Sequence, residues 1–104
     1  LILGVTGGIS ATEHSLRSMI GLLPQNSHWQ LIGIGKNQFE LMDLSLELGG
    51  HVRVGLEDNF YLPSKEMARS NGELVEAAVT MLKKRDQVPC SVDEARGVIG
   101  ISGE

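Results

Sequence analysis

The chain has 104 residues, of which 41% are hydrophobic and 21% are charged, and its formal net charge is −4. This length suits one ordinary domain, and the acidic balance argues against nucleic-acid binding, which needs a basic surface. No run of about 18 apolar residues is present, so the sequence contains no candidate membrane span. The single cysteine, Cys90, cannot form an internal disulfide, which favours a reducing, cytoplasmic location.

Residues 1–5 form an apolar run that is typical of a buried parallel strand. Because the chain begins with Leu and has no polar lead-in, we expect it to be a piece of a longer protein. Further along, Ser10 and Glu13 match a capping box and predict the start of a helix. Before Pro24, apolar residues recur at helical spacing, namely Leu16, Met19, Ile20 and Leu23.

The strand–helix pattern then repeats. A strand is predicted over residues 29–34, a loop over 35–37, and a largely apolar helix over 38–48. Gly49 and Gly50 are expected to end this helix in the left-handed conformation that glycine adopts at little cost.

A third strand is predicted over residues 51–56, followed by a long loop to about Ser70. Ser70 and Glu73 form a second capping box, which predicts a helix. The inward positions of this helix should be Leu74, Val75, Ala78 and Leu82. A third capping box, Ser91 with Glu94, opens a short last helix that runs to about Ile99.

Three consecutive strand–helix repeats predict an α/β fold with a parallel sheet, because parallel strands need crossover connections. Such units build either an open doubly wound sheet or part of a (β/α)8 TIM barrel. A three-stranded sheet alone would leave two edges and one face uncovered, which favours a barrel fragment. The expected units cover roughly residues 1–24, 28–50 and 51–104.

Functional groups in both architectures gather at the carboxyl ends of the strands. Two of these ends are rich in glycine, with Gly7 and Gly8 after the first strand and Gly35 after the second. Small residues let a ligand approach the backbone, and the following helix N-termini favour anions. The loops match neither the dinucleotide fingerprint nor the phosphate-binding P-loop, and Gly-Gly is also a common turn requirement.

The end of the third strand carries ionisable residues, and it gives the stronger signal. Arg53 can hold a carboxylate in bidentate fashion, Glu57 can ligate a divalent metal, and Asp58 can act as a base or orient one. The alternative is an internal Arg53–Glu57 ion pair, although four residues along a strand separates the two side chains widely. The three histidines are interpreted as structural or solvated, namely His14, His28 and His51. The cysteine, Cys90, is expected to be structural and partly buried.

The sequence resembles the β-keto acid cleavage enzyme family over essentially the whole chain. The resemblance rests on the run Gly-Gly-His-Val-Arg-Val-Gly-Leu-Glu-Asp-Asn at residues 49–59 and on three shorter motifs. These are Tyr61-Leu62, Ser70-Asn71-x-Glu73-Leu74-Val75 and Glu94-Ala95-Arg96. It covers only the C-terminal part of that family.

The resemblance implies the last three units of a zinc-dependent TIM barrel, usually a homotetramer. It also implies cleavage of a β-keto acid with acetyl-CoA, giving acetoacetate and a new CoA thioester by a retro-Claisen route. Glu57 matches the carboxylate ligand of the zinc, Arg53 the arginine that holds the substrate carboxylate, and Asp58 the adjacent acid that supports proton transfer. Gly7, Gly8 and Gly35 would lie near the substrate or CoA.

The same resemblance implies partners that this chain lacks, namely a His-x-His pair of zinc ligands, a serine and a glutamate from the N-terminal half. The 104-residue chain alone is therefore expected to be inactive. Two other functions remain open: a non-catalytic α/β module that assembles with other chains through its strand edges, and a different metal-dependent barrel lyase or aldolase.

Overall fold

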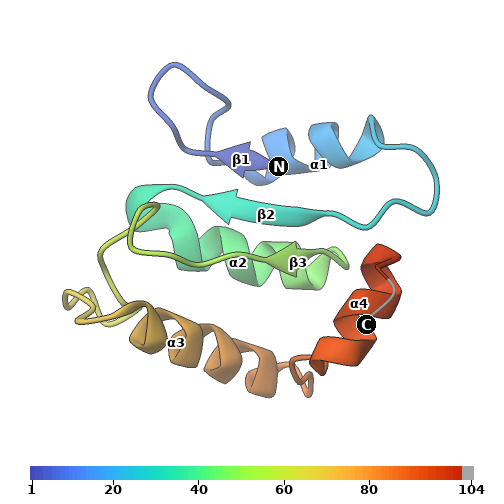
Figure 1. Cartoon of the computed structure of the whole chain (residues 1–104). Coiled ribbons are helices and arrows are strands. Elements are labelled where there is room, and N and C mark those ends of the chain that lie inside the picture. Colours follow the sequence, from blue (N-terminus) through green and yellow to red (C-terminus); the bar gives the residue numbers. More distant parts are fainter. Residues whose placement is uncertain (102–104) are drawn as a thin grey trace.

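The computed structural model describes residues 1–101 and alternates strands with helices (Figure 1). The last three residues of the expected unit 51–104 lie outside the described residues. The elements are β1 (Ile2–Leu3), α1 (Glu13–Gly21), β2 (Gln30–Gly33), the 3-10 helix η1 (Gly35–Asn37), α2 (Gln38–Glu47), β3 (His51–Val52), α3 (Asn71–Lys84) and α4 (Val92–Ile99).

The three strands form a parallel sheet in the order β1-β2-β3. Ile2 lies opposite Ile32, and Gln30 lies opposite His51. Figure 1 shows the strands pointing the same way, so that their carboxyl ends share one side of the molecule. The predicted α/β class and the parallel sheet are confirmed. The strands are shorter than predicted, most of all the third, which leaves the ladder after Val52.

Helices cover one face of this sheet. Leu16 of α1 and Leu41 of α2 pack against Leu3 and Leu31 of the strands in one buried cluster. A second cluster joins α2 to α3 through Phe39, Met42, Leu74 and Ala78, and the chain from Val52 to Leu56 packs on it. Both clusters lie on the same side of the strands, and they position α2 behind β2 and β3.

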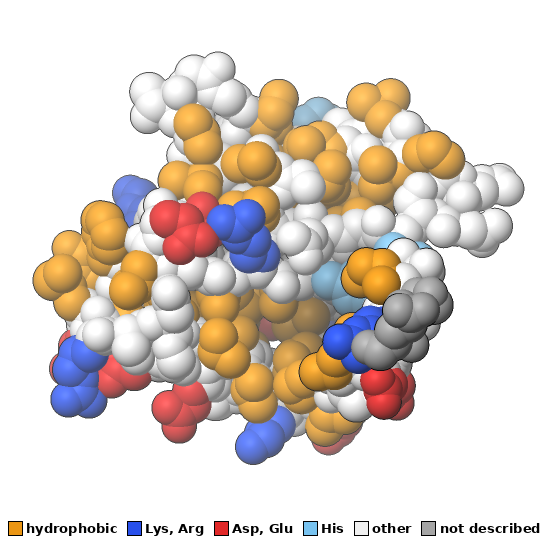
Figure 2. All heavy atoms as spheres, in the orientation of Figure 1, with side chains coloured by type: hydrophobic (Ala, Val, Ile, Leu, Met, Phe, Trp, Pro, Cys, Tyr) orange, Lys and Arg blue, Asp and Glu red, His pale blue; other side chains and the backbone are white. Residues whose placement is uncertain are grey.

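The opposite face of the sheet is open to solvent in residues 1–101. Strand side chains alternate between the two faces, so this face carries Ile2, Gln30, Ile32, His51 and Arg53. Ile2 is 51% exposed, and Figure 2 shows hydrophobic side chains scattered over this side of the molecule. The chain thus presents a sheet covered by helices on one side only.

The helix starts agree with the predicted caps in two of three cases. Ser70 and Ser91 both accept from the N–H three residues on, and Ser91 with Glu94 forms a reciprocal capping box. The prediction that Ser10 caps the first helix is wrong. Thr12 is the N-cap and accepts from the Ser15 N–H, so the helix begins two residues later than predicted, at Glu13.

The two glycines after α2 serve different purposes. Gly49 has the predicted left-handed conformation, with φ of +85°. Gly50 does not have this conformation, so the prediction is wrong there. Position 50 needs glycine because a side chain would not fit. A Cβ on Gly50 would lie 2.4 Å from the Trp29 ring and 2.7 Å from Ser45 Oγ. The backbone after α2 therefore passes too close to its neighbours for any side chain.

Two further burial predictions are wrong. Val75 is 50% exposed, because the inward face of α3 follows Leu74 and Ala78 instead. Cys90 is exposed rather than partly buried, since it lies in the connection before α4 and not under it. Among the described residues, no helix combines the length and apolar character needed to cross a membrane.

Candidate functional site at the carboxyl end of the sheet

The chain after β3 turns back on itself rather than continuing as a strand. The Arg53 N–H still donates to the Leu31 carbonyl, at 3.2 Å. At Gly55 the backbone reverses, because its carbonyl accepts from both the Asp58 and Asn59 N–H groups, at 3.0 and 3.2 Å. The prediction of an extended strand through Leu56 is therefore wrong in its last part, and a tight turn carries the two carboxylates.

This turn brings Arg53 and Glu57 into contact. Four residues of extended strand would separate them by roughly 13 Å, at about 3.3 Å per residue. In the structure Arg53 Nη2 lies 2.7 Å from Glu57 Oε1. The ion pair considered as an alternative from the sequence thus forms, but it lies at the strand end and remains about half exposed. The Glu57 backbone N–H and the Arg53 guanidinium both lower the pKa of Glu57.

Asp58 lies on the other side of the same guanidinium, and its environment is different. Its side chain is only 10% exposed, and its Oδ2 lies 3.4 Å from Arg53 Nε. That oxygen is buried and accepts no hydrogen bond from any of the described residues. A buried carboxylate oxygen without a hydrogen bond costs free energy unless a further group completes its environment. Asp58 Oδ2 is thus held by the ion pair with Arg53 Nε and by no hydrogen bond from the described residues.

A series of buried side-chain hydrogen bonds fixes the turn to the rest of the fold. Asn59, 5% exposed, donates from Nδ2 to Gln38 Oε1 at 3.2 Å, and its Oδ1 accepts from the Tyr61 N–H at 3.1 Å. Gln38, 1% exposed, donates in turn to the Gly33 carbonyl at 3.3 Å. These hydrogen bonds connect the end of β2, the start of α2 and the turn after β3. Sequence analysis did not single out Asn59 or Gln38.

Gly35 belongs to this site, whereas Gly7 and Gly8 do not line it. The Gly35 N–H donates to the Asp58 carbonyl at 2.8 Å. A strand-end pocket of about 160 Å³ opens beside it, lined by Gly35, Lys36 and residues 57–61. Gly7 and Gly8 lie in the exposed loop after β1, where the Gly8 N–H bonds to the Val5 carbonyl at 2.9 Å.

The donor set for a metal is incomplete among the residues that the structure describes. Among residues 1–101, no three His, Cys, Asp or Glu side chains come close enough to hold an ion. Glu57 offers one carboxylate, with Oε1 bound to Arg53 and half of the side chain exposed. A protein zinc site normally takes at least three side chains. The described residues fit one side of a metal site and no more.

His51 and His28 lie at the opposite, amino end of the strands. Their ring centroids are 6.0 Å apart, and a cavity of about 330 Å³ there is lined by both histidines, Cys90 and part of α4. His51 begins β3, whereas Glu57 and Asp58 lie in the turn beyond the carboxyl end of that strand. His14 is exposed in the first turn of α1, as predicted.

The fold and this strand-end cluster define an α/β protein whose ionisable groups lie beyond the carboxyl edge of a parallel sheet. The β-keto acid cleavage enzyme family model matches residues 1–101. The chain is 44% identical to a 3-keto-5-aminohexanoate cleavage enzyme of Acetoanaerobium sticklandii, over 97% of this chain and 37% of that protein. It is 40% identical to the enzyme of the same name from Fusobacterium nucleatum, over 96% of this chain and 36% of that protein.

A third relative has a different name. It is the 3-oxoadipate:acetyl-CoA acetyltransferase of Cupriavidus necator, 36% identical over 85% of this chain and 30% of that protein. The chain belongs to the β-keto acid cleavage enzyme family. It spans about a third of the length of the curated relatives it matches, and it matches only their C-terminal part.

Proposed function

We propose that these residues form the C-terminal part of a zinc-dependent β-keto acid cleavage enzyme. The reaction joins a β-keto acid with acetyl-CoA and yields acetoacetate and a new CoA thioester by a retro-Claisen route. The proposal is supported by the family and by relatives named for cleavage of a keto acid or for transfer from acetyl-CoA.

The observation that carries the proposal is one guanidinium held between two carboxylates at the strand end. Arg53 reaches Glu57 through Nη2 and Asp58 through Nε. Its Nη1 group takes part in neither contact, and the side chain is 43% exposed. Arg53 therefore has donors left with which to hold the carboxylate of a β-keto acid in a planar, two-point contact.

Asp58 would move the proton. Its Oδ2 lies 3.4 Å from Arg53 Nε and accepts no hydrogen bond from the described residues, so this oxygen has an acceptor site left with which to take a proton from a substrate carbon or hydroxyl. The buried hydrogen bonds through Asn59 and Gln38 fix the turn that carries Asp58, which lines the strand-end pocket.

Glu57 would hold the zinc through the oxygen that Arg53 does not bind. The remaining ligands would come from parts of the enzyme outside this chain, because no three potential ligands come together among the described residues. When bound, zinc supplies a Lewis acid that polarises the keto oxygen.

The same proposal extends to the architecture. The open sheet face with Ile2, Ile32 and Arg53 would line the interior of a (β/α)8 barrel, of which these are the last three units. The complete enzyme would be a cytoplasmic homotetramer, and the 104-residue chain alone would be inactive because it lacks the other side of the site.

Metal analysis of the full-length polypeptide tests this function. We expect about one zinc per chain in the wild type and a loss of at least about 100-fold in zinc affinity for Glu57→Gln, since even outer-shell partners are worth 10–100-fold. Glu13→Gln, in the exposed Arg17–Glu13 pair of α1, is the matched control and should keep its zinc. Full metal content in Glu57→Gln, or the lack of a His-x-His at the end of an early strand of the full-length sequence, contradicts the zinc assignment.

The activity assay separates the remaining candidates. We expect the full-length polypeptide to form a CoA thioester from a β-keto acid and acetyl-CoA, and the 104-residue chain with added zinc to form none. If the 104-residue chain forms the CoA thioester, the proposal that it is inactive alone is wrong. A metal-loaded full-length protein that cleaves carbon–carbon bonds without CoA identifies a different lyase or aldolase.

A further inference from the structure

The motif Ser70-Asn71-x-Glu73-Leu74-Val75 forms the start of α3. Ser70 caps this helix, because its Oγ accepts from the Glu73 N–H at 3.3 Å. Leu74 is fully buried and packs α3 against α2 in the second cluster. The Asn71 side chain takes part in neither contact. The start of α3 is therefore a fixed point of the fold from which Asn71 can reach another segment.

Asn71 holds the turn after β3. Its Oδ1 accepts from the Leu56 N–H at 2.8 Å, although the two residues are 15 positions apart. Leu56 is the first central residue of this turn, which the bond from the Asp58 N–H to the Gly55 carbonyl closes at 3.0 Å. A β-turn is closed by the groups of its outer residues, so the N–H of its first central residue is free for an external acceptor. Asn71 supplies that acceptor from a helix that is anchored in the core.

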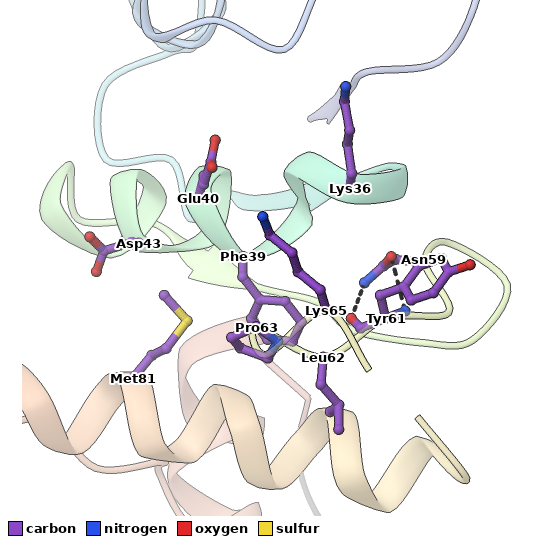
Figure 3. A pocket seen from close by; sticks show the side chains of 10 residues that line it. All are labelled: Lys36, Phe39, Glu40, Asp43, Asn59, Tyr61, Leu62, Pro63, Lys65 and Met81. Atoms are coloured by element: carbon purple, nitrogen blue, oxygen red, sulfur yellow. Dashed lines mark hydrogen bonds between the residues drawn. The ribbon is translucent and has the colours of Figure 1, made fainter. Parts of the chain in front are cut away.

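A second asparagine holds the other end of the turn (Figure 3). Asn59 makes two hydrogen bonds with the backbone of Tyr61, one as donor to its carbonyl and one as acceptor from its N–H. Gln38 accepts a further bond from the same amide and connects it to α2. Asn71 thus acts on the peptide group before Glu57, and Asn59 acts beyond it.

Gly55 leaves room for the Glu57 carboxylate. A Cβ added at position 55 would lie 2.5 Å from Glu57 Oε1 and 2.6 Å from its Cδ. The carboxylate is therefore folded back over the Gly55 backbone, in the position where Oε1 meets Arg53. Gly55 is buried, and its φ lies outside the left-handed region, so the backbone there accepts alanine. A methyl group at position 55 would displace the carboxylate.

We propose that Asn71 and Gly55 are positioning residues, which together fix where the Glu57 carboxylate lies. The inference rests on the proposed function, in which this carboxylate is a zinc ligand. Asn71 fixes the peptide group that precedes Glu57, and Gly55 provides the space into which the Glu57 side chain folds. Both residues act on the metal site through Glu57.

Zinc affinity of the full-length polypeptide, measured by competition with a chelator, tests the inference. We expect Asn71→Ala to lower this affinity at least about tenfold, at the lower end of the range for residues that orient a metal ligand. Asn71→Asp keeps an oxygen acceptor of the same reach and should bind zinc as tightly as the wild type. Gly55→Ala should also lower the affinity at least about tenfold, because it moves the ligand itself. Unchanged zinc binding in Asn71→Ala or in Gly55→Ala overturns the role of that residue.

Ser70→Ala is the matched control, because it removes the same kind of bond at the same helix start, from a side-chain oxygen to a backbone N–H. It should lower the midpoint of thermal unfolding at least as much as Asn71→Ala, since alanine is the better helix former at position 71 and a poor cap at position 70. Its zinc affinity should stay unchanged. An equal loss of zinc affinity in Ser70→Ala and Asn71→Ala, or no recovery in Asn71→Asp, shows that Asn71 only stabilises the helix and overturns its positioning role.

The proton resonance of the Leu56 amide, recorded for the metal-free full-length polypeptide, reports the bond to Asn71 independently of zinc and of turnover. It should move upfield in Asn71→Ala, because the amide loses its acceptor, and return in Asn71→Asp. An unmoved resonance in Asn71→Ala shows that Asn71 does not hold the turn. If the wild type binds no zinc and has no transferase activity while this resonance moves as expected, the proposed function fails and the hold of Asn71 on the turn stands.

Discussion

Arg53 is shared between two carboxylates that differ in exposure. Glu57 is 57% exposed, whereas Asp58 is 10% exposed. A guanidinium can serve both because its donors form a planar fork, and it still leaves a nitrogen for a ligand. A lysine has one compact ammonium and could not span the same three partners.

The substitution Arg53→Lys tests this geometry. In the full-length polypeptide we expect KM for the β-keto acid to rise about 10–100-fold with a smaller change in kcat, because two-point recognition of the carboxylate is lost. Arg17→Lys is the control, since Arg17 also pairs with a glutamate four residues away but lies on exposed α1. Equal effects of the two variants would contradict a substrate contact at Arg53.

The ionisation of Glu57 gives a second prediction. Its folded pKa is lowered, first by its own backbone N–H and then by Arg53. The stabilising pairing with Arg53 is therefore present above the unfolded pKa of about 4.3 and is lost as the pH falls through the lower folded value. NMR titration of the Glu57 carboxyl should give a midpoint below that ordinary pKa of about 4.3. In Arg53→Gln the midpoint should move upward, and an unmoved midpoint would show that Arg53 does not stabilise the charge.

At the level of the elements, the turn after β3 depends on a side chain that comes from α2. Asn59 is buried and bonded to both Gln38 and its own loop. We expect Asn59→Ala to lower the free energy of unfolding by about 1–3 kcal/mol, because the partners of the amide are left buried and unpaired. Chemical denaturation of the full-length polypeptide measures this loss. Gln25→Ala, at an exposed position, should change it by less than about 0.5 kcal/mol.

The helices and the alternation of strands with helices could be predicted from the sequence, because their signals are local. The α2 helix starts at Gln38 as expected and ends at Glu47, one residue before the predicted end at Leu48. The last two helices begin at their capping serines. The first cap was wrongly assigned to Ser10 because Thr12 offers an equivalent hydroxyl two residues later, and no local rule ranks the two.

The site was predicted only in part. The residue types at 53, 57 and 58 indicated chemistry at the strand end, and the structure brings the three together. The turn that does so escaped prediction, because alternating apolar residues through Leu56 are typical of a longer strand. Gln38 carried no signal either, since a glutamine at a helix start is usually solvated. Only the long-range packing of α2 against β2 and the turn buries it.

On the scale of the whole molecule, the sheet has two free edges and one open face in residues 1–101. Parallel sheets are almost always covered on both faces, and unpaired edges favour association. We expect the 104-residue chain alone to associate with rising concentration, as measured by light scattering. Ile2→Lys places a charge on an edge strand and should shift the association to higher concentration. A chain that stays monomeric throughout would contradict this picture.

The hydrogen bond from the Gly35 N–H to the Asp58 carbonyl has a consequence for observing the site. The two residues are 23 positions apart, and the amide is released only when the turn after β3 separates from the end of β2. Deuterium uptake at that single amide would therefore report how often the carboxylate side of the site opens, in the absence of metal and substrate. Slow uptake there beside fast uptake in the loop after β1 would describe a protein that keeps one rim of its site assembled while the other rim moves.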